Sequence, residues 1–142
     1  MYKISFAASA GRVILDSLTN QVSIIDVYEG FKSQSFPFVI PSIAVIFYVL
    51  RDEVDPVSAE FTLRCEVGDT ETLSTPLRVE FDNGLATRAI VNFEGFLIPK
   101  PGLLRIIALS DTDVLAAIDL PVEQLEFPPP SVKTEPSEVS GA

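Results

Sequence analysis

The stretch Glu60-Phe-Thr-Leu-Arg-Cys-Glu-Val67 decides the fold, because its side chains alternate strictly between polar and apolar. In an extended strand the four apolar residues fall on one face, whereas a helix would scatter them around its circumference. A second alternating stretch at 77–82 follows the Gly68-Asp69 turn signal. We therefore predict that these two stretches form an antiparallel pair of half-buried strands.

The same period of two runs through most of the chain, and no segment shows a helical period over 12 or more residues. Strands with one apolar face must stack as two sheets around a shared core. We predict an all-β, antiparallel, immunoglobulin-like β-sandwich of seven or eight strands, although the Cys-Trp-Cys hallmark of true immunoglobulin domains is missing. The expected strands are 2–8 with an extension to 15 left open, 21–28, 43–51, 60–67, 77–82, 86–97, 103–110 and 114–122.

A change of composition near residue 127 marks the expected domain boundary. The chain has 142 residues, which suits one domain. Pro128-Pro-Pro130 cannot donate ladder hydrogen bonds, and residues 131–142 are mostly Ser, Glu, Pro and Val without periodicity. We predict a folded domain over 1–126 and a disordered, Pro-rich, acidic tail over 127–142.

The charge balance argues against several classes of partner. The chain has 20 acidic and 10 basic residues, a net charge of −10, and no cluster of Lys or Arg. Nucleic-acid binders and proteins that dock on anionic membranes need basic surface, so neither role is expected. The longest apolar run, 43–50, is too short for a membrane helix, and the N-terminus is a poor match to a signal peptide. We therefore expect a cytoplasmic protein.

The residue types of the usual catalytic sites are missing from this sequence. There is no His, which removes Ser-His-Asp and Cys-His sites, and the glycines never cluster into a phosphate loop. The one cysteine, Cys65, lies on the apolar face of its strand, so we expect a buried and unreactive thiol. We predict that the protein is not an enzyme and needs no cofactor, with a carboxylate-based hydrolase as the least favoured alternative.

Acidic turns are the candidates for a bound ion. Asp52 and Asp55 lie in one expected loop, and Asp111 and Asp113 lie in another. Calcium takes six to eight oxygen ligands, which loops at one end of a sandwich can supply. Aspartate also favours turns for local reasons, and no Asp-x-Asp-x-Asp-Gly run is present. A ligand- or calcium-binding sandwich is therefore the second hypothesis for function.

Two expected strands, 43–50 and 103–109, are apolar on both faces apart from Arg105. The favoured interpretation is a pair of central strands whose outer faces are covered, for example by the connection 31–41. The alternative is an exposed apolar patch that binds a partner or a second copy of the chain. The candidate interaction residues are Ile46, Tyr48, Leu103 and Ile107.

The leading hypothesis for function follows from that alternative: a non-enzymatic protein-interaction or self-assembly module. It predicts that Ile46→Asp or Ile107→Asp disrupts assembly more than the fold. If these side chains instead belong to a core, both variants should unfold and aggregate.

Two segments resemble a family of small bacterial β-sandwich proteins of unknown function. The first is Asn20-Gln-Val-Ser-Ile-Ile-Asp-Val-Tyr-Glu-Gly30 followed by Phe36-Pro37, and the second is Val91-Asn-Phe-Glu-Gly95 followed by Pro101-Gly102 and Leu104-Arg-Ile-Ile-Ala-Leu109. The resemblance covers about residues 13–122, and it departs from the family at Asp26, where a glycine is usual. It implies a β-sandwich and brings no catalytic residues.

Overall fold

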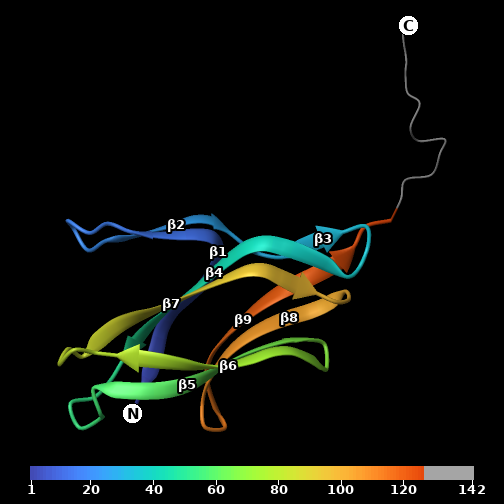
Figure 1. Cartoon of the computed structure of the whole chain (residues 1–142). Helices are drawn as coiled ribbons and strands as arrows, with labels where there is room; N and C mark the ends of the chain where they lie inside the picture. Colours follow the sequence, from blue (N-terminus) through green and yellow to red (C-terminus); the bar gives the residue numbers. More distant parts are fainter. Residues whose placement is uncertain (127–142) are drawn as a thin grey trace, which may run out of the picture.

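The computed structural model describes residues 1–126, which form two β-sheets that face each other (Figure 1). The four-stranded sheet has the order β2-β1-β4-β7, and the five-stranded sheet has the order β3-β9-β8-β5-β6. The described residues contain no helix, so the prediction of an all-β sandwich is confirmed. The strands are β1 (Lys3–Leu15), β2 (Val22–Val27), β3 (Phe31–Ser33), β4 (Phe38–Leu50), β5 (Ser58–Val67), β6 (Thr70–Glu80), β7 (Ala86–Ile98), β8 (Gly102–Ser110) and β9 (Asp113–Gln124).

The structure departs from the predicted strand set at β3. The described residues contain nine strands rather than seven or eight, and β3 pairs with β9 in parallel, so the sandwich is not wholly antiparallel. The strand β3 has only three residues, which is too short for an alternating pattern to stand out from its surroundings.

The strand β4 also begins earlier than predicted, at Phe38, and continues through Pro41. Proline lacks a backbone N–H, so it normally excludes a central strand position. Here β1 pairs with β4 only between Ala44 and Leu50, which leaves Pro41 where β4 has a single neighbour. The proline therefore costs no ladder bond toward β1.

The core lies between the two sheets and uses the predicted alternation. The four apolar residues of the deciding stretch, from Phe61 to Val67, are all buried in it, as are Ile43, Val45, Phe47 and Val49 of β4 from the opposite sheet. Leu104 and Ile106 of β8 complete its centre. The predicted pairing of β5 with β6 is confirmed over the length of β5.

The β1–β2 hairpin covers the outer face of β4. Beyond Ala10, β1 parts from β4 and pairs with β2 alone. Arg88 on β7 donates hydrogen bonds to the side-chain and main-chain oxygens of Asn20, at 3.3 and 2.6 Å. Because β4 lies between β1 and β7, the hairpin must cross β4 to make this contact. The expectation that the connection 31–41 covers this face is therefore wrong, because that connection supplies β3 of the other sheet and the start of β4.

Two other expectations concern a membrane-spanning helix and the C-terminal tail. No helix among residues 1–126 is long and apolar enough to cross a bilayer. The predicted disordered tail, residues 127–142, lies outside the described residues.

Candidate functional site

The outer faces of the two sheets differ in chemistry. Seven large apolar side chains on the strands of the four-stranded sheet are exposed, against two on the strands of the five-stranded sheet. The five-stranded sheet instead carries three ion pairs along its strands, Arg64–Glu66 at 3.4 Å, Arg78–Glu80 at 2.8 Å and Arg105–Asp119 at 2.9 Å. The exposed apolar set of the four-stranded sheet comprises Phe6, Ile14, Leu15, Val27, Val39, Tyr48 and Leu97, and that of the five-stranded sheet comprises Leu103 and Val114.

The four predicted interaction residues lie on both outer faces rather than on one. Ile46 and Tyr48 belong to the four-stranded sheet, and Leu103 and Ile107 belong to the five-stranded sheet. Ile46 is 3% exposed and Ile107 is 2% exposed, so this chain itself encloses both side chains. Tyr48 and Leu103 are 39% and 41% exposed. Only these two present surface to another molecule, and they do so on opposite sides of the sandwich.

Different neighbours bury the two isoleucines. Val22 and Ile24 of the hairpin line a common hollow with Ile46. Ile107 lies in register between Arg64 of β5 and Ala117 of β9, where the aliphatic stem of an arginine can cover it. The favoured interpretation of the sequence, central strands with covered outer faces, therefore describes both residues.

A hollow of about 350 Å³, here called the Tyr48 hollow, opens between the hairpin and β4. The hollow is mainly apolar. Two exposed aromatic side chains lie beside it, since Phe6 of β1 is in register with Tyr48 of β4. Sequence reasoning missed Phe6, because strict alternation places it on the same face as Ile4. A β-bulge between Ile4 and Phe6 turns Phe6 to the outer face instead. The hollow is lined by Phe6, Val22, Ile24, Ile46, Tyr48 and Arg88.

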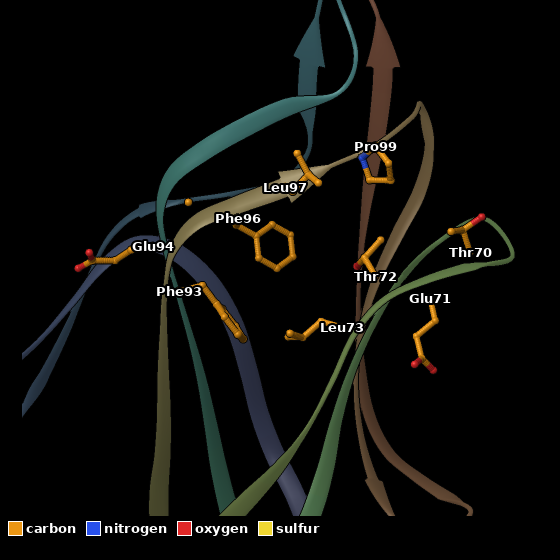
Figure 2. A pocket seen from close by; sticks show the side chains of 10 residues that line it. Thr70, Glu71, Thr72, Leu73, Phe93, Glu94, Phe96, Leu97 and Pro99 are labelled. Atoms are coloured by element: carbon orange, nitrogen blue, oxygen red, sulfur yellow. The ribbon is translucent and has the colours of Figure 1, made fainter.

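A second hollow, here called the β6–β7 groove, lies where the edges of the two sheets separate (Figure 2). Its volume is about 480 Å³, and its floor is apolar. The rings of Phe93 and Phe96 lie 5.5 Å apart on β7, and Leu73 faces them from β6 (Figure 2). Gly95, with φ of 70°, lets β7 turn between the two phenylalanines. The groove is lined by Thr70, Glu71, Thr72, Leu73, Phe93, Glu94, Gly95, Phe96, Leu97 and Pro99.

The candidate ion-binding aspartates are not gathered into one site. Asp52 and Asp55 both accept hydrogen bonds from the ammonium of Met1, and this contact together with the backbone N–H of Asp52 lowers the pKa of Asp55. Asp111 and Asp113 lie at the turn between β8 and β9. Within residues 1–126, no three His, Cys, Asp or Glu side chains form a group that can hold a metal ion.

The thiol of Cys65 is fully buried in the core, as the alternation predicts. Burial raises its pKa to about 12, because the thiolate would lose its hydration. Roughly one thiol in ten thousand would therefore be ionised at pH 8 in the folded protein. We predict no reaction with Ellman's reagent at pH 8 under native conditions and one thiol per chain in guanidinium. Rapid native labelling would contradict the buried position.

A family described as "Family of unknown function (DUF6941)" matches residues 5–123, which span both sheets. The chain belongs to the DUF6941 family. This confirms the resemblance to a family of unknown function and extends it at both ends of the predicted range. No protein with a curated description was found to be similar to this DUF6941 chain.

The departure of this DUF6941 chain at Asp26 has a structural explanation. Asp26 adopts φ of 61°, in the left-handed region that glycine enters freely and most other residues avoid. A glycine at this position would relieve that conformation, whereas Asp is among the side chains that tolerate it. The backbone at the end of β2 is therefore one that glycine adopts without strain.

Proposed function

We propose that this domain is a non-enzymatic self-assembly module that pairs with a second copy of the chain through the outer face of the four-stranded sheet. The observation that carries the proposal is the concentration of exposed large apolar side chains on the strands of that sheet, where Phe6 and Tyr48 are cross-strand neighbours. Exposed apolar patches of this kind are typical of protein interfaces. The opposite outer face instead carries charged pairs, and the side chains of two of them, Arg78–Glu80 and Arg105–Asp119, are 40% exposed or more.

The distribution of charge favours this face, among the surfaces of the molecule, as the place where a second copy binds. Two chains of net charge −10 repel each other, and the repulsion is weakest where acidic side chains are few. β4, the central strand of the face, carries no charged residue. The whole four-stranded sheet carries three basic and two acidic residues, namely Lys3, Arg12, Arg88, Asp26 and Glu94.

We also propose that the sandwich is immunoglobulin-like in its strand order. In immunoglobulin domains the third, sixth and seventh strands are neighbours, and the second strand pairs with the fifth in the other sheet. The order β5-β8-β9 and the pair β4–β7 support this correspondence, with β6 as an added edge strand.

The single buried thiol suits a reducing compartment, which supports a cytoplasmic location.

The test is sedimentation equilibrium of the full chain and of two matched variants. Tyr48→Lys places a charge on the apolar face, and Leu103→Lys does so at similar exposure on the other sheet. We expect the native chain to form a dimer or larger species. Tyr48→Lys should weaken association by about tenfold or more, as loss of a central aromatic contact does, whereas Leu103→Lys should leave it unchanged.

Circular dichroism should show the same fold for all three proteins. A native chain that stays monomeric at millimolar concentration would overturn the proposal. Equal effects of the two substitutions would also overturn it, because they would show that the four-stranded face has no special part in assembly.

A further inference from the structure

The β6–β7 groove is flanked by two free strand edges. β7 is the last strand of its sheet and β6 is the last strand of the other, so each leaves one row of backbone N–H and C=O groups without a strand partner in the described residues. Free edges of this kind can pair with an added strand from another chain.

Of the two edges, β7 is the better template. Proline at position 76 removes a donor from the middle of β6, and prolines of this kind protect edge strands from pairing. β7 has 13 residues and no proline between Ala86 and Ile98. β4 pairs with its inner edge from Leu50 and Ala86 to Phe38 and Ile98 in one constant register, with a single interruption at Pro41 and Gly95. An incoming strand would therefore add to a long, well-anchored edge.

The groove beside this edge offers apolar contacts to one side of an added strand. Phe93, Phe96 and Leu73 form its floor, and Leu97 is 51% exposed at its margin (Figure 2). Successive side chains of a strand point to opposite faces, so alternate residues of the added segment would enter the groove. Apolar residues at those positions fit the floor.

The rim of the groove is acidic. Glu71 of β6 and Glu94 of β7 lie on opposite sides of it, both exposed, with their side chains pointing away from the apolar floor (Figure 2), and neither forms an ion pair within the described residues. The adjacent cation, Lys100, is held by Asp69 at 3.3 Å. The side chains of the added strand that do not enter the groove would lie on the same sheet face as Glu94, which has no ion-pair partner among residues 1–126, so basic residues fit those positions.

We infer that the β6–β7 groove binds an extended segment of another protein, in which apolar residues alternate with Lys or Arg, and which adds as a strand to the free edge of β7. This site is separate from the Tyr48 hollow, and Leu97 is its one lining residue that also belongs to the exposed apolar set of the four-stranded sheet. An acidic segment is disfavoured by Glu71 and Glu94, and a folded second copy would bring further negative charge.

The experiment uses the full chain and a pool of labelled peptides of about ten residues. In these peptides every second residue is Lys, and the residues between vary among Val, Ile, Leu and Phe. A block pool has the same composition with all lysines at one end, and an acidic pool has Glu in place of Lys. Fluorescence anisotropy measures binding, and hydrogen–deuterium exchange locates the protected amides.

We expect the alternating pool to bind about tenfold more tightly than the block pool, to lose affinity as salt is raised, and to protect amides within 86–98. The acidic pool should not bind. Leu97→Asp should weaken binding about tenfold, because it removes an apolar contact and places a charge at the margin. Val39→Asp is the matched control, since Val39 is the cross-strand neighbour of Leu97 with 52% exposure and lies outside the groove.

Three results would overturn the inference. Equal affinity for the block pool would show that charge alone drives binding. Protection outside β7, or an equal effect of Val39→Asp, would place the peptide on the open sheet face. An alternating pool that fails to bind at millimolar concentration would show that the groove does not accept a strand. Because Tyr48→Lys leaves the groove intact, that variant should bind the alternating pool as the native chain does, whatever its own assembly state.

Discussion

Replacing Phe47 by alanine should lower the free energy of unfolding by about 3–5 kcal/mol, the usual cost of deleting a buried phenyl ring. Phe47 is the largest fully buried side chain, and in β4 it is paired with Ala7 of β1 on one side and with Ala89 of β7 on the other. The neighbouring backbone is fixed by both ladders, so the surrounding residues cannot collapse into the space. Urea denaturation at 25 °C, followed by far-ultraviolet circular dichroism, measures the change.

The matched control is Val54→Ala in the loop between β4 and β5. Val54 is 91% exposed, so its truncation should change the free energy of unfolding by no more than about 0.5 kcal/mol. If Phe47→Ala were as mild as this control, Phe47 could not be packed between the two sheets. A change in the slope of the free energy of unfolding against urea concentration, with the midpoint unchanged, would instead indicate a change in the unfolded state.

Ile46→Asp should destabilise the fold by about 4 kcal/mol or more at pH 7. Ile46 is enclosed beneath the β1–β2 hairpin, so the new carboxyl must be neutral or the hairpin must open. Keeping an aspartic acid of ordinary pKa neutral at pH 7 costs about 4 kcal/mol, to which the lost apolar contacts add. This reverses the expectation drawn from the sequence, that the substitution disrupts assembly more than the fold.

The sign of the pH dependence distinguishes this cause from simple loss of packing. Burial would raise the pKa of the new carboxyl above its unfolded value. The penalty is therefore complete above the folded pKa and disappears as the pH falls below the unfolded pKa, near 4. Urea denaturation at pH 7 and pH 4 measures the difference in the free energy of unfolding between Ile46→Asp and Ile46→Val. We expect this difference to be smaller at pH 4. If the difference did not change with pH, the carboxyl of the introduced aspartate would have to be in contact with water.

The alternating stretches were sufficient to predict every strand except β3, and the core between the sheets. Phe61, Leu63 and Cys65 are buried together because the other face of their strand is exposed to solvent. Apolar residues therefore occupy every second position of the strand. Where a strand is apolar on both faces, as β4 is, the pattern says only that something covers it. Which segment does so depends on the path of a hairpin that bends away from its sheet, and no periodicity encodes that path.

The candidate sites were harder to predict for a related reason. Leu73 and Phe96 meet across the β6–β7 groove although they are far apart in sequence, and they belong to different sheets. Their proximity follows from how the two sheets stack rather than from any local spacing. Tyr48 and Leu103 could be chosen from their apolar neighbourhoods, but the sequence did not reveal that they lie on opposite faces.

The parallel pair of β3 and β9 has a consequence for the order in which the chain folds. Phe31 pairs with Val122, so this contact joins segments that are 91 residues apart in the sequence. Closing so long a loop carries a large entropic cost, which is recovered only when the intervening strands are already in place. The β5–β6 and β8–β9 hairpins, whose partners are adjacent in sequence, can form early. The last step is then the docking of a three-residue strand, and a nascent chain that lacks β9 must leave β3 without its neighbour.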